Sequence, residues 1–239
     1  MSQINPKAAA AALATCCLAC ALALTATATA ADTDKPGPKL KGWGQVVDPD
    51  RDCDVTFKDG AVEFKVPGTP HDFAADIKVQ NSPRVLRELK GDFSAEVKVS
   101  GAFKPGATST IPGRLSYHGA GLLVIKDNDN YVSLHRGCLN QDGQLRHYAN
   151  FELRKNGEMD ISLYEIEIPD QDTYLRLERR GARVFNATSP DGVHWTSYDP
   201  IPLELSESVQ FGVVGVSSSD VPLSVKFQDL TVFRKATVE

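Results

Sequence analysis

The sequence predicts an all-β fold, a β-sandwich of two antiparallel sheets, and three observations support this. Apolar and polar residues alternate with a period of two in several segments, as in strands that bury one face. Between these segments Gly follows Asp, Asn or Arg, which is typical of tight hairpin turns. No long segment has the 3.6-residue periodicity of an amphipathic helix. Many strands joined by such turns are typical of a sandwich or jelly roll.

The expected strands follow one another along the chain without an internal repeat. Residues 122–125 form a short continuous apolar run, which suits a strand covered on both faces. The strands are expected at 93–99, 122–125, 131–135, 148–154, 174–178, 209–216 and 223–233. The dipeptides that mark turns between strands are Asp59-Gly60, Asn156-Gly157, Arg180-Gly181 and Asp191-Gly192.

The N-terminal segment has the layout of a cleavable secretory signal. Lys7 is the only charged residue before Asp32, and an Ala-rich apolar run is followed by small residues at 28–30. We expect residues 1–31 to be removed, 32–41 to form a polar linker, and 42–239 to form one β-sandwich domain. The expected location is the periplasm or the cell exterior. A retained N-terminal anchor and a lipoprotein signal at Cys16 are the alternatives.

Charge and cysteine content narrow the possible partners. Without Lys7 the chain has 25 basic and 31 acidic side chains, a net charge of −6 instead of −5. An acidic chain has no electrostatic reason to bind nucleic acid or an anionic membrane, so neither partner is expected. Cys53 and Cys138 remain after cleavage, and an oxidising compartment allows a disulfide between them. Two free thiols are the alternative.

Several segments together resemble a known family. They include Gly42-Trp43-Gly44, a Gly-Leu-Leu…Asp-Asn-Tyr pattern over 121–131 and a Ser-x-Asp-Gly-x-x-Trp pattern over 189–195. The chain resembles the domain-of-unknown-function 1349 family of the concanavalin A-like lectin/glucanase superfamily, and the last two patterns are also similar to the C-terminal sandwich of some xylosidases. The resemblance implies a concanavalin A-like jelly-roll sandwich and an extracellular, often sugar-related setting. It implies no established activity.

Polar residues of three expected strands alternate with their apolar residues and are predicted to share one outward face. Aromatic rings stack on sugar C–H faces, and Arg, Glu and Asn form hydrogen bonds with sugar hydroxyls. The sequence therefore predicts a carbohydrate-binding face, and a solvated face with cross-strand Arg–Glu pairs is the alternative. The candidate ligand-binding residues are Tyr131, His135, Tyr148, Asn150, Glu152, Tyr174, Arg176 and Glu178.

A run of aspartates is the candidate metal site. Asp48, Asp50 and Asp52 stand at every second position, and Asp59 has the place of the last ligand in an EF-type loop. Calcium is therefore the candidate cofactor. Cys53 replaces the Gly that makes the sharp turn in such loops, and the flanking residues suit strands. A solvated strand edge is the alternative.

Glu165 and Glu167 are weak candidates for a pair of glycosidase carboxylates. The run over 165–170 partly resembles the Glu-x-Asp-x-x-Glu run of the sandwich glucanases, which carries two carboxylates on one strand face. Its central Asp is a Glu, its last Glu is an Asp, and Pro169 interrupts the strand. These departures favour a polar strand face without catalysis.

The sequence as a whole predicts an exported, lectin-like sandwich that acts as a non-catalytic carbohydrate-binding module. One alternative is a glycoside hydrolase-like enzyme that uses carboxylates on the polar face. Another is a structural or protein-interaction sandwich without a small ligand. The residues favour binding over catalysis and leave the sugar, the calcium ion and the oligomeric state open.

Overall fold

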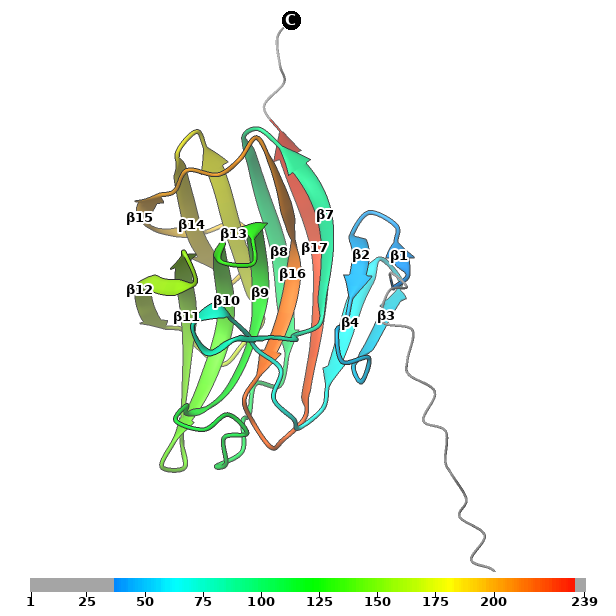
Figure 1. Ribbon diagram of the computed structural model, residues 1–239, viewed down its shortest axis with the longest axis vertical. Helices are drawn as coiled ribbons and strands as arrows, with labels where there is room; N and C mark the ends of the chain where they lie inside the picture. Colours follow the sequence, from blue (N-terminus) through cyan, green and yellow to red (C-terminus); the bar gives the residue numbers. More distant parts are fainter. Residues whose placement is uncertain (1–36, 235–239) are drawn as a thin grey trace, which may run out of the picture. The chain divides into compact units, whose positions relative to one another are not determined.

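The structure is a computed structural model that describes residues 37–234, apart from the side chains of residues 161–165. Nearly all of this part is β-structure, arranged as two large antiparallel sheets that pack face to face (Figure 1). The predicted all-β jelly-roll sandwich is confirmed. The predicted signal peptide, residues 1–31, lies outside the described residues.

One sheet has eight strands. In spatial order it contains β1 (Lys39–Leu40), β2 (Gly44–Val47), β7 (Arg84–Lys90), β16 (Ser208–Ser217), β9 (Ser116–Asp127), β10 (Asn130–Gln141), β11 (Gln144–Lys155) and β12 (Glu158–Glu167). Its central part, β9 to β11, is a run of consecutive hairpins. Residues 39–40, which the sequence assigns to a linker, form β1 and pair with β2.

The other sheet has seven strands. In spatial order it contains β15 (Thr196–Pro202), β14 (Arg183–Ser189), β13 (Thr173–Arg180), β8 (Phe93–Gly101), β17 (Leu223–Arg234), β4 (Ala61–Val66) and β3 (Asp54–Lys58). The hairpin that joins β3 to β4 has Asp59 at φ 52° and Gly60 at φ 79°. Two successive positive φ angles are those of a type I′ turn, so this turn has the predicted chemistry.

The main core lies between the two sheets, because the apolar residues of each strand alternate toward the other sheet. Leu122 and Val124 of β9, and Leu175 and Leu177 of β13, belong to this one cluster of buried side chains. Phe93 of the seven-stranded sheet packs edge to face on Phe211 of the eight-stranded sheet, with 5.6 Å between ring centroids. Burial of each such ring contributes about 1.5–3 kcal/mol.

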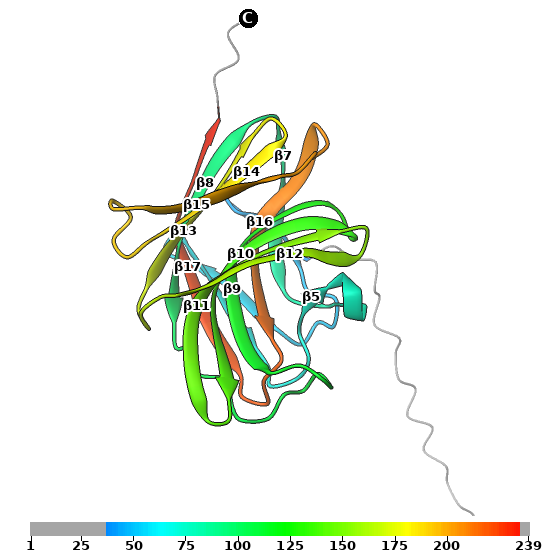
Figure 2. The same ribbon diagram turned by 90° about the vertical axis from the view of Figure 1, so that its left-hand side faces the viewer.

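The outer face of the eight-stranded sheet, which points away from the seven-stranded sheet, is partly covered. A short segment made of β5 (Phe73–Ala74), the 3₁₀ turn η1 (Ala75–Ile77) and β6 (Val79–Gln80) lies over it (Figure 2). Phe73 packs there with Leu123 and Ile125, the residues of β9 that alternate with its core residues. The apolar run at 122–125 is therefore covered on both faces, as predicted.

The two cysteines of the described residues are free thiols, the second of the two alternatives that the sequence leaves open, and not a Cys53–Cys138 disulfide. Cys53 lies just before β3, at the edge of the seven-stranded sheet, and Cys138 is buried within β10 of the other sheet. Their thiols have different neighbours, Asp52 for Cys53 and His147 for Cys138.

None of the helical segments in residues 37–234 is long and apolar enough to cross a membrane.

Candidate functional site

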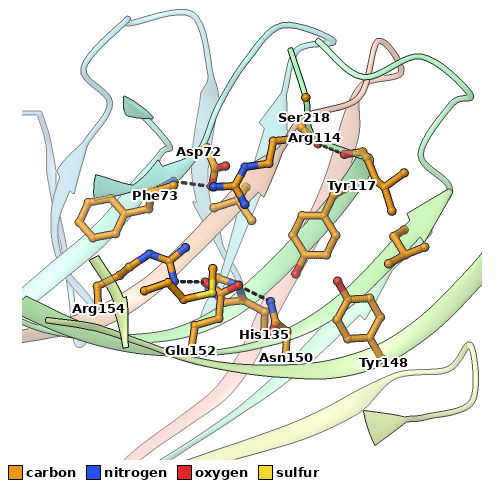
Figure 3. A pocket seen from close by; sticks show the side chains of 16 residues that line it. Asp72, Phe73, Arg114, Tyr117, His135, Tyr148, Asn150, Glu152, Arg154 and Ser218 are labelled. Atoms are coloured by element: carbon orange, nitrogen blue, oxygen red, sulfur yellow. Dashed lines mark hydrogen bonds and ion pairs between the residues drawn. The ribbon is translucent and has the colours of Figure 1, made fainter. Parts of the chain in front are cut away.

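A cavity of about 320 Å³ opens on the outer face of the eight-stranded sheet. Its floor is formed by side chains of β9, β10 and β11, and its walls come from residues 72–74 beside β5 and from residues 113–115 before β9 (Figure 3). The volume is at the lower end of the range for small-molecule sites. The polar and aromatic side chains that line it include Asp72, Arg114, Tyr117, His135, Tyr148, Asn150, Glu152 and Arg154.

Two tyrosine rings form one end of the cavity. Tyr117 of β9 and Tyr148 of β11 have ring centroids 6.1 Å apart at an interplanar angle of 42°, and their hydroxyls point toward each other (Figure 3). Gly119 and Gly137 lie beneath the Tyr117 ring, and a Cβ on Gly137 would stand 2.6 Å from the Tyr117 hydroxyl oxygen. The two glycines thus leave the space in which this ring lies flat on the sheet.

A row of hydrogen-bonded polar groups forms the other end. Asn150 Nδ2 donates to Glu152 Oε1 at 2.8 Å, and Arg154 Nη1 lies 3.3 Å from Glu152 Oε2. Arg154 Nε also donates to Asp76 Oδ1 at 3.2 Å, and Arg114 Nη2 donates to Asp76 Oδ2 at 2.6 Å. The carboxylate of Asp76 therefore joins β11, η1 and the loop before β9 around the cavity.

Burial changes the protonation of two groups that line the cavity. It raises the pKa of Asp72 to about 6, against the stabilising hydrogen bond from the Phe73 N–H, and the charge of Glu152 adds to the rise. It lowers the pKa of His135 to about 4, against the charge of Glu152. His135 Nε2 is buried and has no hydrogen-bond partner among the described residues. It is therefore a polar atom that a ligand hydroxyl can satisfy.

These two shifts predict opposite pH dependences. The folded state keeps the Asp72 proton up to a higher pH than the unfolded state does. The contribution of Asp72 to the free energy of unfolding therefore falls as the pH rises from about 4 to 6. In the folded state His135 stays neutral down to a lower pH than in the unfolded state. Its contribution to the free energy of unfolding therefore falls as the pH drops from 6.5 to about 4. The free energy of unfolding of Asp72→Asn, minus that of the wild type, should rise between about pH 4 and 6. The same difference for His135→Gln should rise as the pH falls from 6.5 to about 4. Each change amounts to at most about 1.4 kcal/mol per pH unit. Urea unfolding at several pH values measures both differences, and differences that do not change with pH contradict the assignment.

Five of the predicted ligand-binding residues lie on this outer face, at different depths. His135, Tyr148, Asn150 and Glu152 line the cavity. Tyr131 lies on the same face but is buried under β5, where its hydroxyl donates to Phe73 O and accepts from Ala75 N–H. Tyr131 thus holds the covering segment on the sheet.

The other three, Tyr174, Arg176 and Glu178, are a correction to the prediction of one shared face. They belong to β13, which lies in the seven-stranded sheet, so they point outward on the opposite side of the sandwich. There Arg176 lies over the Trp195 ring at 3.7 Å and pairs with Glu96. Alternation identified the outward residues of β13, but it does not say to which sheet a strand belongs.

The aspartate run does not form the predicted EF-type loop. Asp48 Oδ2 accepts from the Cys53 N–H, Asp50 accepts from Asn81, and Asp52 contacts His71. Asp59 lies in the turn at the far end of β3. A five-residue strand spans about 16 Å, so Asp59 is separated from the other three by the strand itself.

Of the two weak catalytic candidates, the structure describes the side chain of Glu167. Glu167 is exposed at the end of β12, opposite Tyr148 in the register, and does not line the cavity. The side chain of Glu165 lies outside the described residues. The strand ends at Glu167, before Pro169, as the missing N–H of proline favours.

Sequence reasoning missed four residues of the site: Asp72, Arg114, Tyr117 and Arg154. Tyr117 had one usable signal, because it precedes Gly119 by two residues and so shares a strand face with it. Arg154 is the last residue of the strand expected at 148–154, and it alternates with the apolar residues of that strand as Glu152 does. Asp72 and Arg114 come from loops, and only the fold brings them to the sheet.

Comparison with known proteins gives a family and a fold. A model of the family described as "Protein of unknown function (DUF1349)" matches residues 69–235. No curated protein matches the chain.

Three solved structures with similar folds have low sequence identity to this chain. A functionally unknown protein from Saccharomyces cerevisiae is 18% identical, with 81% of this chain and 97% of that chain covered and a TM-score of 0.65. A xylan beta-1,4-xylosidase from Bacillus halodurans is 13% identical, with 84% and 41% covered and a TM-score of 0.55. The carbohydrate-binding module CBM66 from Bacillus subtilis is 14% identical, with 82% and 100% covered and a TM-score of 0.50. The chain thus spans about two fifths of the xylosidase, and these likenesses concern the fold.

Proposed function

This chain belongs to the DUF1349 family, and we propose that it binds carbohydrate, without catalysis, in the cavity on the outer face of its eight-stranded sheet. The observation that carries the proposal is the pairing of two tyrosine rings with a fixed row of polar side chains on one open face. Two similar folds come from a xylosidase and a carbohydrate-binding module, which supports a sugar-related role.

The chemistry of the cavity suits a sugar ring. A ring has apolar C–H faces, which the tyrosines can contact, and hydroxyls that both donate and accept hydrogen bonds. Glu152 and Asn150 are held in place by their own hydrogen bonds before any ligand arrives, so little ordering is needed on binding. The buried His135 Nε2 adds one group that gains a partner on binding.

A panel of immobilised glycans tests this proposal with the wild-type protein. We expect saturable binding to a confined set of glycans and no release of reducing sugar from them. Binding to none of the panel would contradict the proposal and favour a protein-interaction sandwich.

Hydrolysis is the second candidate, and one observation favours it. Asp72 and Glu152 both line the cavity, and the raised pKa of Asp72 lets it hold a proton near pH 6, as a general acid must. Release of reducing sugar by the wild type, lost in Asp72→Asn, would establish an enzyme. Release that persists in Asp72→Asn would exclude Asp72 as the acid.

The proposed place of action is the periplasm or the cell exterior, on the basis of the N-terminal sequence. Cell fractionation with an antibody against the protein tests this, and a protein confined to the cytoplasmic fraction would contradict it.

A further inference from the structure

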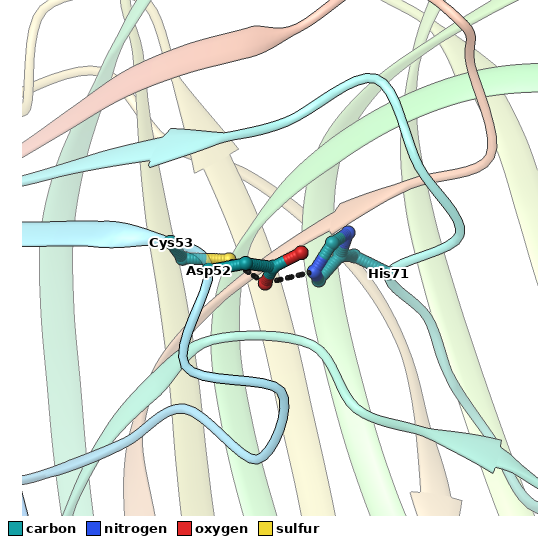
Figure 4. A group of neighbouring side chains, drawn as sticks. All are labelled: Asp52, Cys53 and His71. Carbon is teal, nitrogen blue, oxygen red and sulfur yellow. Dashed lines mark hydrogen bonds and ion pairs between the residues drawn. The ribbon is translucent and has the colours of Figure 1, made fainter. Parts of the chain in front are cut away.

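Three side chains that can ligate a metal converge away from the cavity, where the segment before β3 meets the segment before β5. Asp52 Oδ1 lies 2.8 Å from His71 Nε2 and 3.6 Å from Cys53 Sγ (Figure 4). The three ligand atoms all lie within 4.8 Å of one another. They offer one carboxylate oxygen, one imidazole nitrogen and one sulfur to the same point.

His71 is held rigidly in this group. Its side chain is 1% exposed, and its backbone forms a two-way bridge with Ser217, with N–O distances of 2.9 and 2.6 Å. On the far side of the ring, Nδ1 lies 3.0 Å from Thr69 O. When Nδ1–H donates to this carbonyl, the lone pair of a neutral Nε2 points at the Asp52 carboxylate. A metal ion bound between them would satisfy both groups. Without a metal ion, Nε2–H donates to Asp52 while Nδ1 accepts from the Thr69 hydroxyl, 3.3 Å away.

Cys53 is held by a different contact. Its N–H donates to Asp48 Oδ2 at 3.0 Å, and the other oxygen of Asp48 is buried without a hydrogen-bond partner among the described residues. Burial and the charges of Asp48 and Asp52 make the thiolate costly while no cation is present. A bound divalent cation would offset this concentration of negative charge.

The spacing suits a tetrahedral ion. A sulfur about 2.3 Å and an oxygen about 2.1 Å from such an ion lie roughly 3.6 Å apart, close to the separation of the Cys53 and Asp52 atoms. The shorter His71–Asp52 contact must open by about 0.5 Å to reach the same geometry. The Asp52 side chain is 43% exposed, so it is free to make this movement.

We propose that Asp52, Cys53 and His71 form a binding site for a divalent transition-metal ion, with zinc the best match to the ligands. Sulfur and imidazole ligands favour zinc, whereas calcium requires six to eight oxygens. The Cys53 thiol would release its proton to solvent on binding, and a water would complete the coordination. Because His71 precedes the cavity residue Asp72, the ion would also fix one wall of the cavity.

Metal titration of the purified protein, expressed from the full-length chain and kept reduced without added thiol, tests this proposal. Cobalt(II) should give a thiolate-to-cobalt charge-transfer band that saturates at one equivalent and disappears when zinc is added. Zinc should raise the melting temperature. In Cys53→Ser the band should be lost and zinc should bind at least tenfold more weakly. Cys138→Ser is the matched control, because Cys138 also lies beside a histidine, with Sγ 3.8 Å from His147 Nε2.

Asp52→Asn changes an exposed side chain and should leave the fold intact. It therefore tests the metal site even if Cys53→Ser does not fold. A tenfold or greater loss of zinc affinity in Asp52→Asn supports the site, and unchanged affinity contradicts it. Absence of the cobalt band in the wild type, its persistence in Cys53→Ser, or its loss in Cys138→Ser would overturn the proposal.

Discussion

Replacing Tyr117 with alanine is expected to weaken carbohydrate binding at least tenfold while leaving the protein folded. The ring lies on the outer face of the sheet over Gly119 and Gly137 and belongs to the cavity, not to the core between the sheets. Loss of a central aromatic hot-spot contact costs about 2 kcal/mol or more of binding free energy, which exceeds the roughly 1.4 kcal/mol that corresponds to a factor of ten. Isothermal titration with a glycan retained in the panel measures the affinity, and thermal unfolding measures the fold.

Two further variants make this prediction specific. Gly137→Ala should lower the affinity by a smaller factor, because its Cβ would push against the Tyr117 hydroxyl and tilt the ring. Arg176→Ala should leave the affinity unchanged, because Arg176 lies on the outer face of the other sheet. Weaker binding in Arg176→Ala together with normal binding in Tyr117→Ala would place the sugar on the outer face of the seven-stranded sheet and contradict the proposal.

Replacing Asp76 with alanine is expected to lower both stability and affinity. The Asp76 carboxylate pairs with Arg114 and with Arg154, whose side chain is only 2% exposed. Removing one partner leaves a buried guanidinium with Glu152 alone, which should reduce the free energy of unfolding by about 2–4 kcal/mol. Because the same carboxylate joins three segments of the cavity wall, glycan affinity should fall as well.

Denaturant unfolding and glycan titration of the same samples check the Asp76 prediction. Asp172→Ala is the control, because it removes a carboxylate from a more exposed ion pair with Lys98. Such pairs contribute about 0–1 kcal/mol, so this variant should differ little from wild type. Equal free energies of unfolding for Asp76→Ala and Asp172→Ala would show that the Asp76 ion pairs do not stabilise the fold.

The strands could be predicted from the sequence, because period-two alternation is a local property of the chain. Residues 93–99 and 174–178 form strands whose apolar residues face the core, as expected. The assignment of strands to sheets is not local. The residues of β10 and β11 share a face because the two strands pair directly, whereas β13 pairs with β8 in the other sheet.

For the candidate sites too, residues on neighbouring strands could be predicted, and residues that come from separate segments could not. His135, Tyr148, Asn150 and Glu152 were identified because two paired strands carry all four of them. The spacing of aspartates suggested calcium, but β3 carries Asp59 away from Asp52, and the fold supplies His71 from a distant segment instead. Pairings between distant loops cannot be inferred from the order of residues alone.

Carbohydrate is proposed to bind on the outer face of the eight-stranded sheet. The most direct test of this proposal is an NMR titration of the labelled protein with a glycan from the panel, followed through the backbone amide signals. We expect the signals that shift to cluster at residues 113–118, 135–139 and 148–154. Shifts confined to Tyr174, Arg176 and Trp195 on the opposite face, or no shifts with any glycan, would contradict it.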